Sequence, residues 1–208
     1  MMRPVKEADI EECLHLIRQN KITTVVFDMD QTAVAMHSRG SLARKDVPLF
    51  AGKATDGFLR LVPALHAAKI HLAIATHSDQ AEYETGNHVH EIDRSTHILG
   101  QELATKLLEH CFSPHIASSF FIVAYNPKAR GTKQDPLLCM KRFHMREIQK
   151  HYGVSSDQIL FFDDTEPVVK DCQEYCGVPS VLVDARKGFQ LRDLVRFLSC
   201  EIALDDSR

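Results

Sequence analysis

An apolar run that ends in two closely spaced acids constrains this chain most. Residues 22–27 are almost continuously apolar, and Asp28 and Asp30 follow directly. Such a run is typical of a parallel strand covered on both faces. Side chains two residues apart on a strand share a side, so two carboxylates at its end can approach one site. Two such carboxylates repel each other unless a cation or a phosphate interaction compensates their charge. The alternative interpretation is a surface loop with two solvated acids.

Further strand-like runs alternate with segments of helical period. The expected strands cover 71–75, 120–125, 159–162 and 180–183, and the expected helices cover 6–19, 55–69, 98–111, 136–151, 168–176 and 191–198. Residues 33–54 read as a loop with at most one short helix, and residues 201–208 as a frayed end. The alternation predicts an α/β fold, with a mostly parallel sheet of about five strands flanked by helices.

Composition and charge exclude several classes of function. The 208 residues suit one domain, and the net charge of −3 does not indicate binding to nucleic acid or to a membrane surface. No apolar run approaches the ~20 residues that cross a bilayer. Six cysteines occur without a CxxC pair or a recognisable secretion signal. We therefore expect reduced thiols and a cytoplasmic location.

Polar residues follow three of the expected strands at the point where each ends. They are Asp28 with Asp30, Thr76, and Asp163 with Asp164. Ligands of open parallel sheets bind outside the carboxyl ends of the strands, so these residues should form one site. A hydroxyl and free backbone N–H groups near Thr76 suit a phosphate oxygen, although threonine is also a common helix cap. Oxygen ligands of this kind suit Mg²⁺.

These segments resemble the motifs of the haloacid dehalogenase (HAD) superfamily, whose fold is Rossmann-like. Residues 25–32 resemble motif I, Thr76 motif II, and residues 159–164 motif IV. Lys141, within Lys-Arg-Phe-His-Met, resembles motif III of the magnesium-dependent phosphatase-1 subfamily. The resemblance implies a phosphatase that forms an aspartyl phosphate on Asp28 and uses Asp30 as the general acid and base.

The resemblance also implies a ligand set and a cofactor. Mg²⁺ would be held by Asp28, the Asp30 carbonyl and Asp164, with Asp163 beside them, while Thr76 and Lys141 would bind the transferred phosphate. The chain departs from the family pattern at Gln31, where glycine is frequent, at Met145, where the subfamily has Phe, and over residues 166–169, which lack its Asn.

Several alternatives remain open on the sequence. Lys133 and Arg142 are rivals to Lys141, and His77 either touches substrate or supports the residues that do. His88 and His90 could bind a second metal, although no accompanying zinc motif supports this. The motifs do not separate hydrolysis from phosphotransfer to another acceptor, and a non-catalytic binding protein could retain the fold. For an enzyme we expect a phosphorylated small molecule or a phosphoprotein as substrate, and the subfamily resemblance implies phosphotyrosine-type or sugar-phosphate substrates.

The spacing of the motifs predicts a minimal cap. Residues 33–54 are too few for a cap domain and are expected to form a substrate loop, and residues 79–119 a helical insertion that packs on the body. We expect an open site walled by residues 33–54 and 126–133. Basic side chains in these segments could meet an acidic substrate or could be ordinary solvated charges: Arg39, Arg44, Lys45, Lys128 and Arg130.

Overall fold

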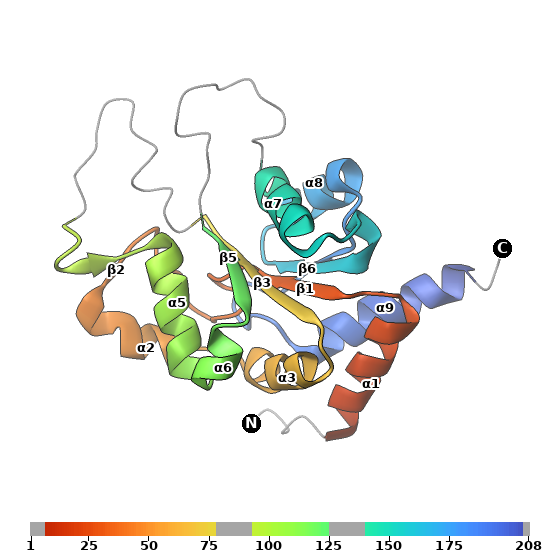
Figure 1. Cartoon of the computed structure of the whole chain (residues 1–208), viewed down its shortest axis with the longest axis horizontal. Coiled ribbons are helices and arrows are strands. Elements are labelled where there is room, and N and C mark those ends of the chain that lie inside the picture. The colour runs from red at the N-terminus through yellow and green to blue at the C-terminus, as the bar shows by residue number, and fades with distance from the viewer. Residues whose placement is uncertain (1–6, 78–92, 125–139, 206–208) are drawn as a thin grey trace.

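A five-stranded parallel sheet forms the centre of the molecule (Figure 1). The computed structural model describes residues 7–77, 93–124 and 140–205, and the side chains of residues 10–77, 93–124 and 140–200. The strand order is β5-β3-β1-β6-β7, which places β1 in the middle. The bounds are β1 Thr24–Phe27, β3 His71–Ala75, β5 Phe120–Val123, β6 Ile159–Asp163 and β7 Ser180–Leu182. The expected α/β, Rossmann-like fold is confirmed.

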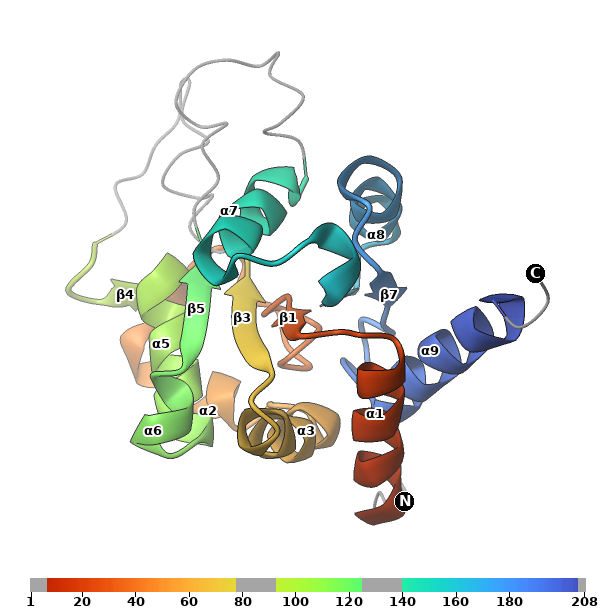
Figure 2. The same cartoon turned by 45° about the vertical axis from the view of Figure 1, so that its right-hand side comes forward.

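Helices cover both faces of this sheet (Figures 1 and 2). On one face lie α7 (Arg142–Tyr152) and α8 (Glu166–Asp171). The other is covered by α1 (Glu7–Gln19), α3 (Asp56–Ala67), α5 (Gly100–Cys111) and α9 (Leu191–Asp205). None of the helices in the described residues has the length and apolarity needed to cross a membrane.

The strand sequences supply both apolar layers because their side chains alternate between the two faces. Val25 and Phe27 of β1 belong to the core that includes α1, α3, α5 and α9, whereas Val26 belongs to the core under α7 and α8. Phe161 and Phe162 of β6 divide between the same two cores. The continuous apolar runs in the sequence are thus explained by burial on both sides.

Residues 33–54 contain more structure than the sequence indicated. They hold the strand β2 (Leu42–Ala43), the 3₁₀ turn η1 (Arg44–Asp46) and the short helix α2 (Val47–Ala51). β2 pairs antiparallel with β4 (His97–Ile98), so two segments distant in sequence meet. Phe50 of α2 is fully buried in the main core. This segment therefore packs on the body of the protein.

Three predicted boundaries are wrong. The last helix does not end near residue 198 with a frayed tail after it, because α9 continues to Asp205. The predicted helix 168–176 begins earlier, with Pro167 in its first turn, and it changes to a π-helical turn over Cys172–Cys176 (η5). The described part of helix 136–151 begins at Arg142, so Lys141 precedes the helix instead of lying on it.

The remaining short elements were not predicted. They are α6 (Pro114–Ala117), which begins with a proline in its first turn, and η4 (Ser156–Gln158), which is held by a capping box. Each is a single turn, too short to produce a helical period in the sequence. Within residues 79–119, Leu103 and Leu107 are buried in the main core, and Leu99 is buried as well.

Candidate active site

The carboxyl ends of the three central strands bring the sequence motifs together. Phe27, the last residue of β1, is in register with Ile74 of β3 and Phe162 of β6. The Asp28 amide donates a hydrogen bond to the Phe162 carbonyl at 2.9 Å, which extends the β1–β6 pairing by one residue. The side chains that follow these strands then face one pocket, with a volume of about 460 Å³.

The pocket contains all the site residues predicted from the sequence. Those residues are Asp28, Asp30, Arg39, Thr76, His77, Lys141, Asp163 and Asp164. The pocket also contains residues that the sequence did not indicate: Gln31, His37, Gly40, Thr165 and Val168. The polar residues that follow these strands therefore line one pocket, as the topology of a parallel sheet predicts.

Lys141 forms the central ion pair of the pocket. Its side chain is 2% exposed, and Nζ donates to Asp28 Oδ1 at 2.6 Å and to the Ala75 carbonyl. The same Nζ lies 4.0 Å from Asp163 Oδ2. Burial would lower the pKa of Lys141, but the charges of Asp28 and Asp163 outweigh burial and raise it. Lys141 is therefore a fixed cation that holds one oxygen of Asp28.

Asp30 has no cation of this kind. Its Oδ2 accepts a hydrogen bond from Ser38 Oγ at 2.6 Å and lies 2.8 Å from His37 Nδ1, whereas its Oδ1 is buried without a hydrogen-bond partner. Burial raises the pKa of Asp30 despite the hydrogen bond from Ser38, and the charge of Asp28 raises it further. The environment of Asp30 thus favours the protonated carboxyl more than water does.

His37 links Asp30 to the turn that follows it. The backbone N–H of Arg39 donates to His37 Nδ1 at 3.0 Å, and the same nitrogen lies 2.8 Å from Asp30 Oδ2. His37 and Ser38 are the functional neighbours that the sequence missed, because nothing in residues 33–54 marks a contact with Asp30.

Asp163 and Asp164 differ in burial. Asp163 is 2% exposed, its Oδ1 accepts from the Thr165 N–H at 2.8 Å, and burial and the charge of Asp28 raise its pKa to about 8. Asp164 is half-buried, and burial followed by the charge of Asp28 raises its pKa as well. Asp163 is thus already engaged by the protein, whereas Asp164 is the more accessible of the two.

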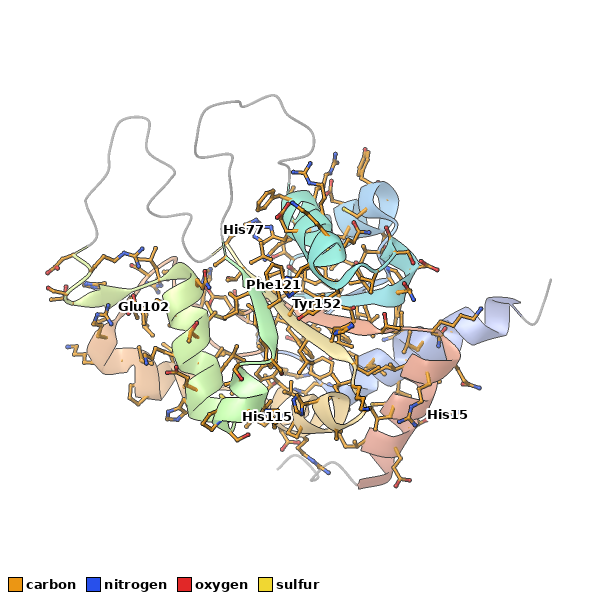
Figure 3. The ribbon with its side chains drawn as sticks, in the orientation of Figure 1. His15, His77, Glu102, His115, Phe121 and Tyr152 are labelled. Atoms are coloured by element: carbon orange, nitrogen blue, oxygen red, sulfur yellow. The ribbon has the colours of Figure 1, made fainter. Side chains whose placement is uncertain are left out.

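His144 fixes the backbone at Thr76. Its Nε2 donates to the Thr76 carbonyl at 3.1 Å, and its Nδ1 is buried without a partner. Burial, and then the charge of Lys141, lowers the pKa of His144 well below its ordinary value. His77 packs edge-on against this ring with 4.8 Å between centroids, and its own Nε2 donates to the Met140 carbonyl at 3.0 Å. Figure 3 shows His77 at the end of β3 beside α7.

The turn after Asp30 has an uncommon backbone conformation. Gln31 has φ of +56°, in the left-handed region that glycine adopts most readily. Glycine is frequent at this position in the family that the sequence resembles, and the dihedral gives the physical reason. Gln31 holds the conformation with two contacts, a backbone hydrogen bond to the Met36 carbonyl at 3.1 Å and a side-chain hydrogen bond to the Ala185 carbonyl at 3.4 Å.

The donor set fits a hard divalent cation. The pocket holds four carboxylates, on Asp28, Asp30, Asp163 and Asp164, and Lys141 is the cation buried among them. The charge of Asp28 raises the pKa of the other three, so the cluster repels itself. Among the described residues, no group of three or more His, Cys, Asp or Glu side chains is arranged to hold a metal ion by itself. Mg²⁺ does not need such a group, because it commonly uses one or two carboxylates with water and substrate phosphate.

Other predicted residues do not reach the pocket. Arg142, a rival to Lys141, instead forms a bidentate pair with Asp171, with its closest N–O distance at 2.5 Å. Arg44 pairs with Glu102 at 2.8 Å and donates to the Arg94 carbonyl, so it does not line the site as expected. Lys45, in η1, is exposed and does not line the pocket. Five further candidates lie outside the described residues: His88, His90, Lys128, Arg130 and Lys133.

Comparisons with known proteins give distant structural similarities. No protein-family model and no curated protein sequence matches this chain. A hypothetical protein from Xanthomonas campestris is 17% identical with a TM-score of 0.43, over 100% of this chain and 96% of the other. A protein from Legionella pneumophila, provisionally named a HAD superfamily (subfamily III A) hydrolase, is 15% identical with a TM-score of 0.39, over 96% and 95%. The chemistry of the site therefore rests on its own side chains.

Proposed function

We propose that this protein is a magnesium-dependent phosphomonoester hydrolase of the HAD type, and that it works through an aspartyl-phosphate intermediate. The observation that carries the proposal is the pairing of two unlike aspartates at the end of β1. Asp28 accepts a hydrogen bond from Lys141 Nζ at 2.6 Å, whereas burial raises the pKa of Asp30, two residues later. A nucleophile needs the first environment and a general acid needs the second.

In the first step Asp28 attacks the phosphorus atom with the carboxylate oxygen that Lys141 leaves available. The bond to phosphorus forms as the bond to the leaving oxygen breaks, and the proton of Asp30 passes to that leaving oxygen. In the second step Asp30 takes a proton from water, the water oxygen attacks phosphorus, and the bond to Asp28 breaks to release phosphate. Each proton that Asp30 donates is thus recovered in the same cycle.

The other pocket residues support the transferred group. Thr76, whose carbonyl is fixed by His144, and the ammonium of Lys141 would bind the phosphate oxygens. Asp28, the Asp30 carbonyl and Asp164 would hold Mg²⁺, which when bound neutralises phosphate charge and orients the group. We also propose that the protein is cytoplasmic and that its cysteines are reduced thiols.

The test is phosphate release from a panel of phosphomonoesters with Mg²⁺ and with EDTA. We expect Asp28→Asn to remain folded and to lose turnover, because an amide keeps the shape of the carboxylate but cannot attack phosphorus. Asp56→Asn, at an exposed position in the first turn of α3, is the matched control and should keep wild-type activity. Near-wild-type turnover in purified Asp28→Asn would refute the assignment.

An added acceptor separates hydrolysis from phosphotransfer. If total substrate cleavage rises with an acceptor alcohol while free phosphate does not, the protein is a phosphotransferase. Hydrolysis is supported if, without the acceptor, phosphate and the substrate's own alcohol are released in equal amounts, at a rate comparable to that with the acceptor. Absence of cleavage across the whole panel would instead favour a non-catalytic binding protein.

A further inference from the structure

The described wall of the pocket is polar almost throughout. Val168 is the one apolar side chain among the described lining residues, and no Phe, Tyr or Leu lines this part of the wall. The acids and Lys141 form its floor, and residues 37–40 contribute His37, Arg39 and Gly40. A volume of about 460 Å³ lies within the range of small-molecule sites. The lining therefore favours a polar substrate that extends beyond its phosphate group.

Arg39 is held in place by its backbone. It has φ of +59° and the following Gly40 has φ of +85°, so two successive residues are left-handed. The Arg39 N–H donates to His37 Nδ1 at 3.0 Å, and His37 and Ser38 both contact Asp30 Oδ2. A non-glycine residue in this conformation is strained, and such strain is often retained at ligand-binding positions. The Arg39 backbone is thus tied through His37 to Asp30, the general acid of the proposed reaction.

The guanidinium of Arg39 has no partner among the described residues. No hydrogen bond or ion pair joins its side chain to another part of the chain in residues 7–77, 93–124 and 140–205. Arg44, five residues further on, differs because Glu102 and the Arg94 carbonyl already engage it. In Figure 3, Glu102 lies well away from His77 at the site. Within the part of the chain that the structure describes, Arg39 is therefore a cation without a countercharge at the pocket.

We propose that Arg39 binds a second anionic group, a carboxylate or a second phosphate, on a small substrate that also carries the reacting phosphomonoester. The planar fork of a guanidinium matches the oxygens of both groups, and its charge does not depend on pH. The acidic floor would repel a second anion, whereas Arg39 offers the opposite charge at the rim. This inference deepens the proposed function and rests on it.

The experiment compares substrates that differ at one group. 3-Phosphoglycerate and glycerol 3-phosphate differ only by a carboxylate in place of a hydroxymethyl group, and fructose 1,6-bisphosphate and fructose 6-phosphate test a second phosphate. We expect a higher kcat/KM for the more anionic member of one or both pairs. In Arg39→Gln this preference should fall about tenfold, mainly through KM, as expected for one charge-assisted contact at an exposed side chain.

Arg44→Gln is the matched control. It removes the same charge from the same segment, but its guanidinium is paired with Glu102, so both the rates and the preference should match those of the wild type. Circular dichroism of each variant confirms that the fold is retained. The substrate pair in which the preference appears shows whether the second anionic group is a carboxylate or a phosphate.

Three outcomes would overturn the inference. The first is turnover of all four substrates without a preference for the anionic members. The second is a preference that Arg39→Gln leaves intact. The third is turnover confined to acidic phosphopeptides, which would identify a protein phosphatase. In all three the proposed phosphatase activity stands, whereas no cleavage of any phosphomonoester would overturn that activity and this inference together.

Discussion

At the scale of single residues, two aspartates of identical chemistry have different environments because their neighbours differ. Asp28 accepts from a buried ammonium at 2.6 Å, while the neighbours of Asp30 are a hydroxyl and an imidazole. Desolvation without a full countercharge raises the pKa of Asp30, as general-acid catalysis requires. In the proposed reaction, the contacts and not the residue type would therefore distinguish the nucleophile from the acid.

Asp30→Asn should slow the reaction in a way that depends on the leaving group. Loss of acid catalysis typically costs ~10²–10⁴-fold, but p-nitrophenolate leaves without a proton and should be affected least. The measurement is kcat for p-nitrophenyl phosphate and for an alkyl phosphate in wild type and variant. Equal losses with both substrates would contradict the acid role.

His144 predicts how stability depends on pH. Its pKa is lowered well below the ordinary 6.5, chiefly by burial, so the unfolded chain binds the proton more tightly than the folded protein does. The stabilising effect of a neutral His144 is therefore complete above pH 6.5 and is lost as the pH falls below it. The loss approaches about 1.4 kcal/mol per pH unit for one proton.

The check is urea unfolding of wild type and His144→Gln between pH 5 and pH 8, with EDTA present. The glutamine amide can still donate to the Thr76 carbonyl but does not titrate, so the free energy of unfolding of the variant should fall less steeply below pH 6.5. His15→Gln, at an exposed position on α1, controls for the loss of one histidine. Parallel curves for wild type and His144→Gln would refute a buried neutral imidazole.

At the scale of elements, the connection between β7 and α9 supports the turn that carries the acids. The Phe189 N–H donates to the Thr32 carbonyl at 2.8 Å. Gly188 precedes it with φ of +62°, and a Cβ there would lie 2.5 Å from Thr55 Cγ2 and 2.7 Å from the Thr32 carbonyl oxygen. This glycine is required both for its dihedral angle and for the close approach of two backbone segments.

Gly188→Ala should destabilise the protein by more than 2 kcal/mol, roughly the sum of a strained dihedral and an overpacked contact. It should also lower kcat, because the clash displaces Thr32 in the turn after Asp30. Gly153→Ala is the matched control, since φ is +66° but no atom lies within 4 Å of the added Cβ. Its cost should be about 1 kcal/mol, with unchanged activity.

Chemical denaturation and steady-state kinetics measure both effects. Equal losses in the free energy of unfolding of the two glycine variants would show that the close approach of Gly188 to Thr32 and Thr55 does not add to the cost of the substitution. A fully active Gly188→Ala would show that the turn after Asp30 is positioned by other contacts.

At the scale of the whole molecule, the parallel sheet gathers more negative charge than its own cation can balance. Four carboxylates line the pocket at the ends of β1 and β6, and Lys141 pairs with two of them, Asp28 and Asp163. Without another cation, the raised pKa values of Asp30, Asp163 and Asp164 reduce this repulsion by favouring protons. A divalent cation that binds the folded state alone would both relieve the repulsion and stabilise the fold.

Mg²⁺ should therefore raise the Tm, by the equivalent of about 1.4 kcal/mol at a concentration near ten times its Kd, and EDTA should reverse the shift and abolish activity. Asp164→Ala should weaken this response more than Asp163→Ala. The reason is that Asp163 already accepts from Thr165 and faces Lys141, whereas Asp164 lies at the pocket surface. Thermal melts across a Mg²⁺ titration test the order, and the reverse order would reassign the metal ligand.

The sequence determined the sheet and the chemistry at its edge. Apolar runs such as residues 22–27 identify strands because burial on both faces is a local requirement. Asp28, Thr76 and Asp163 lie at or just after the ends of such strands. The rule for parallel sheets then predicts that they share one site, without knowledge of any side-chain contact. Local pattern and topology were sufficient for that part of the site.

Only the tertiary structure decided which basic and loop residues complete the site. Lys141 and Arg142 are adjacent in sequence, yet one reaches Asp28 and the other Asp171. Likewise Arg39 lines the pocket and Arg44 does not, because pairing of β2 with β4 brings Glu102 to Arg44. Such choices depend on contacts between segments far apart in the chain, and loops without a hydrophobic period carry no local signal of them.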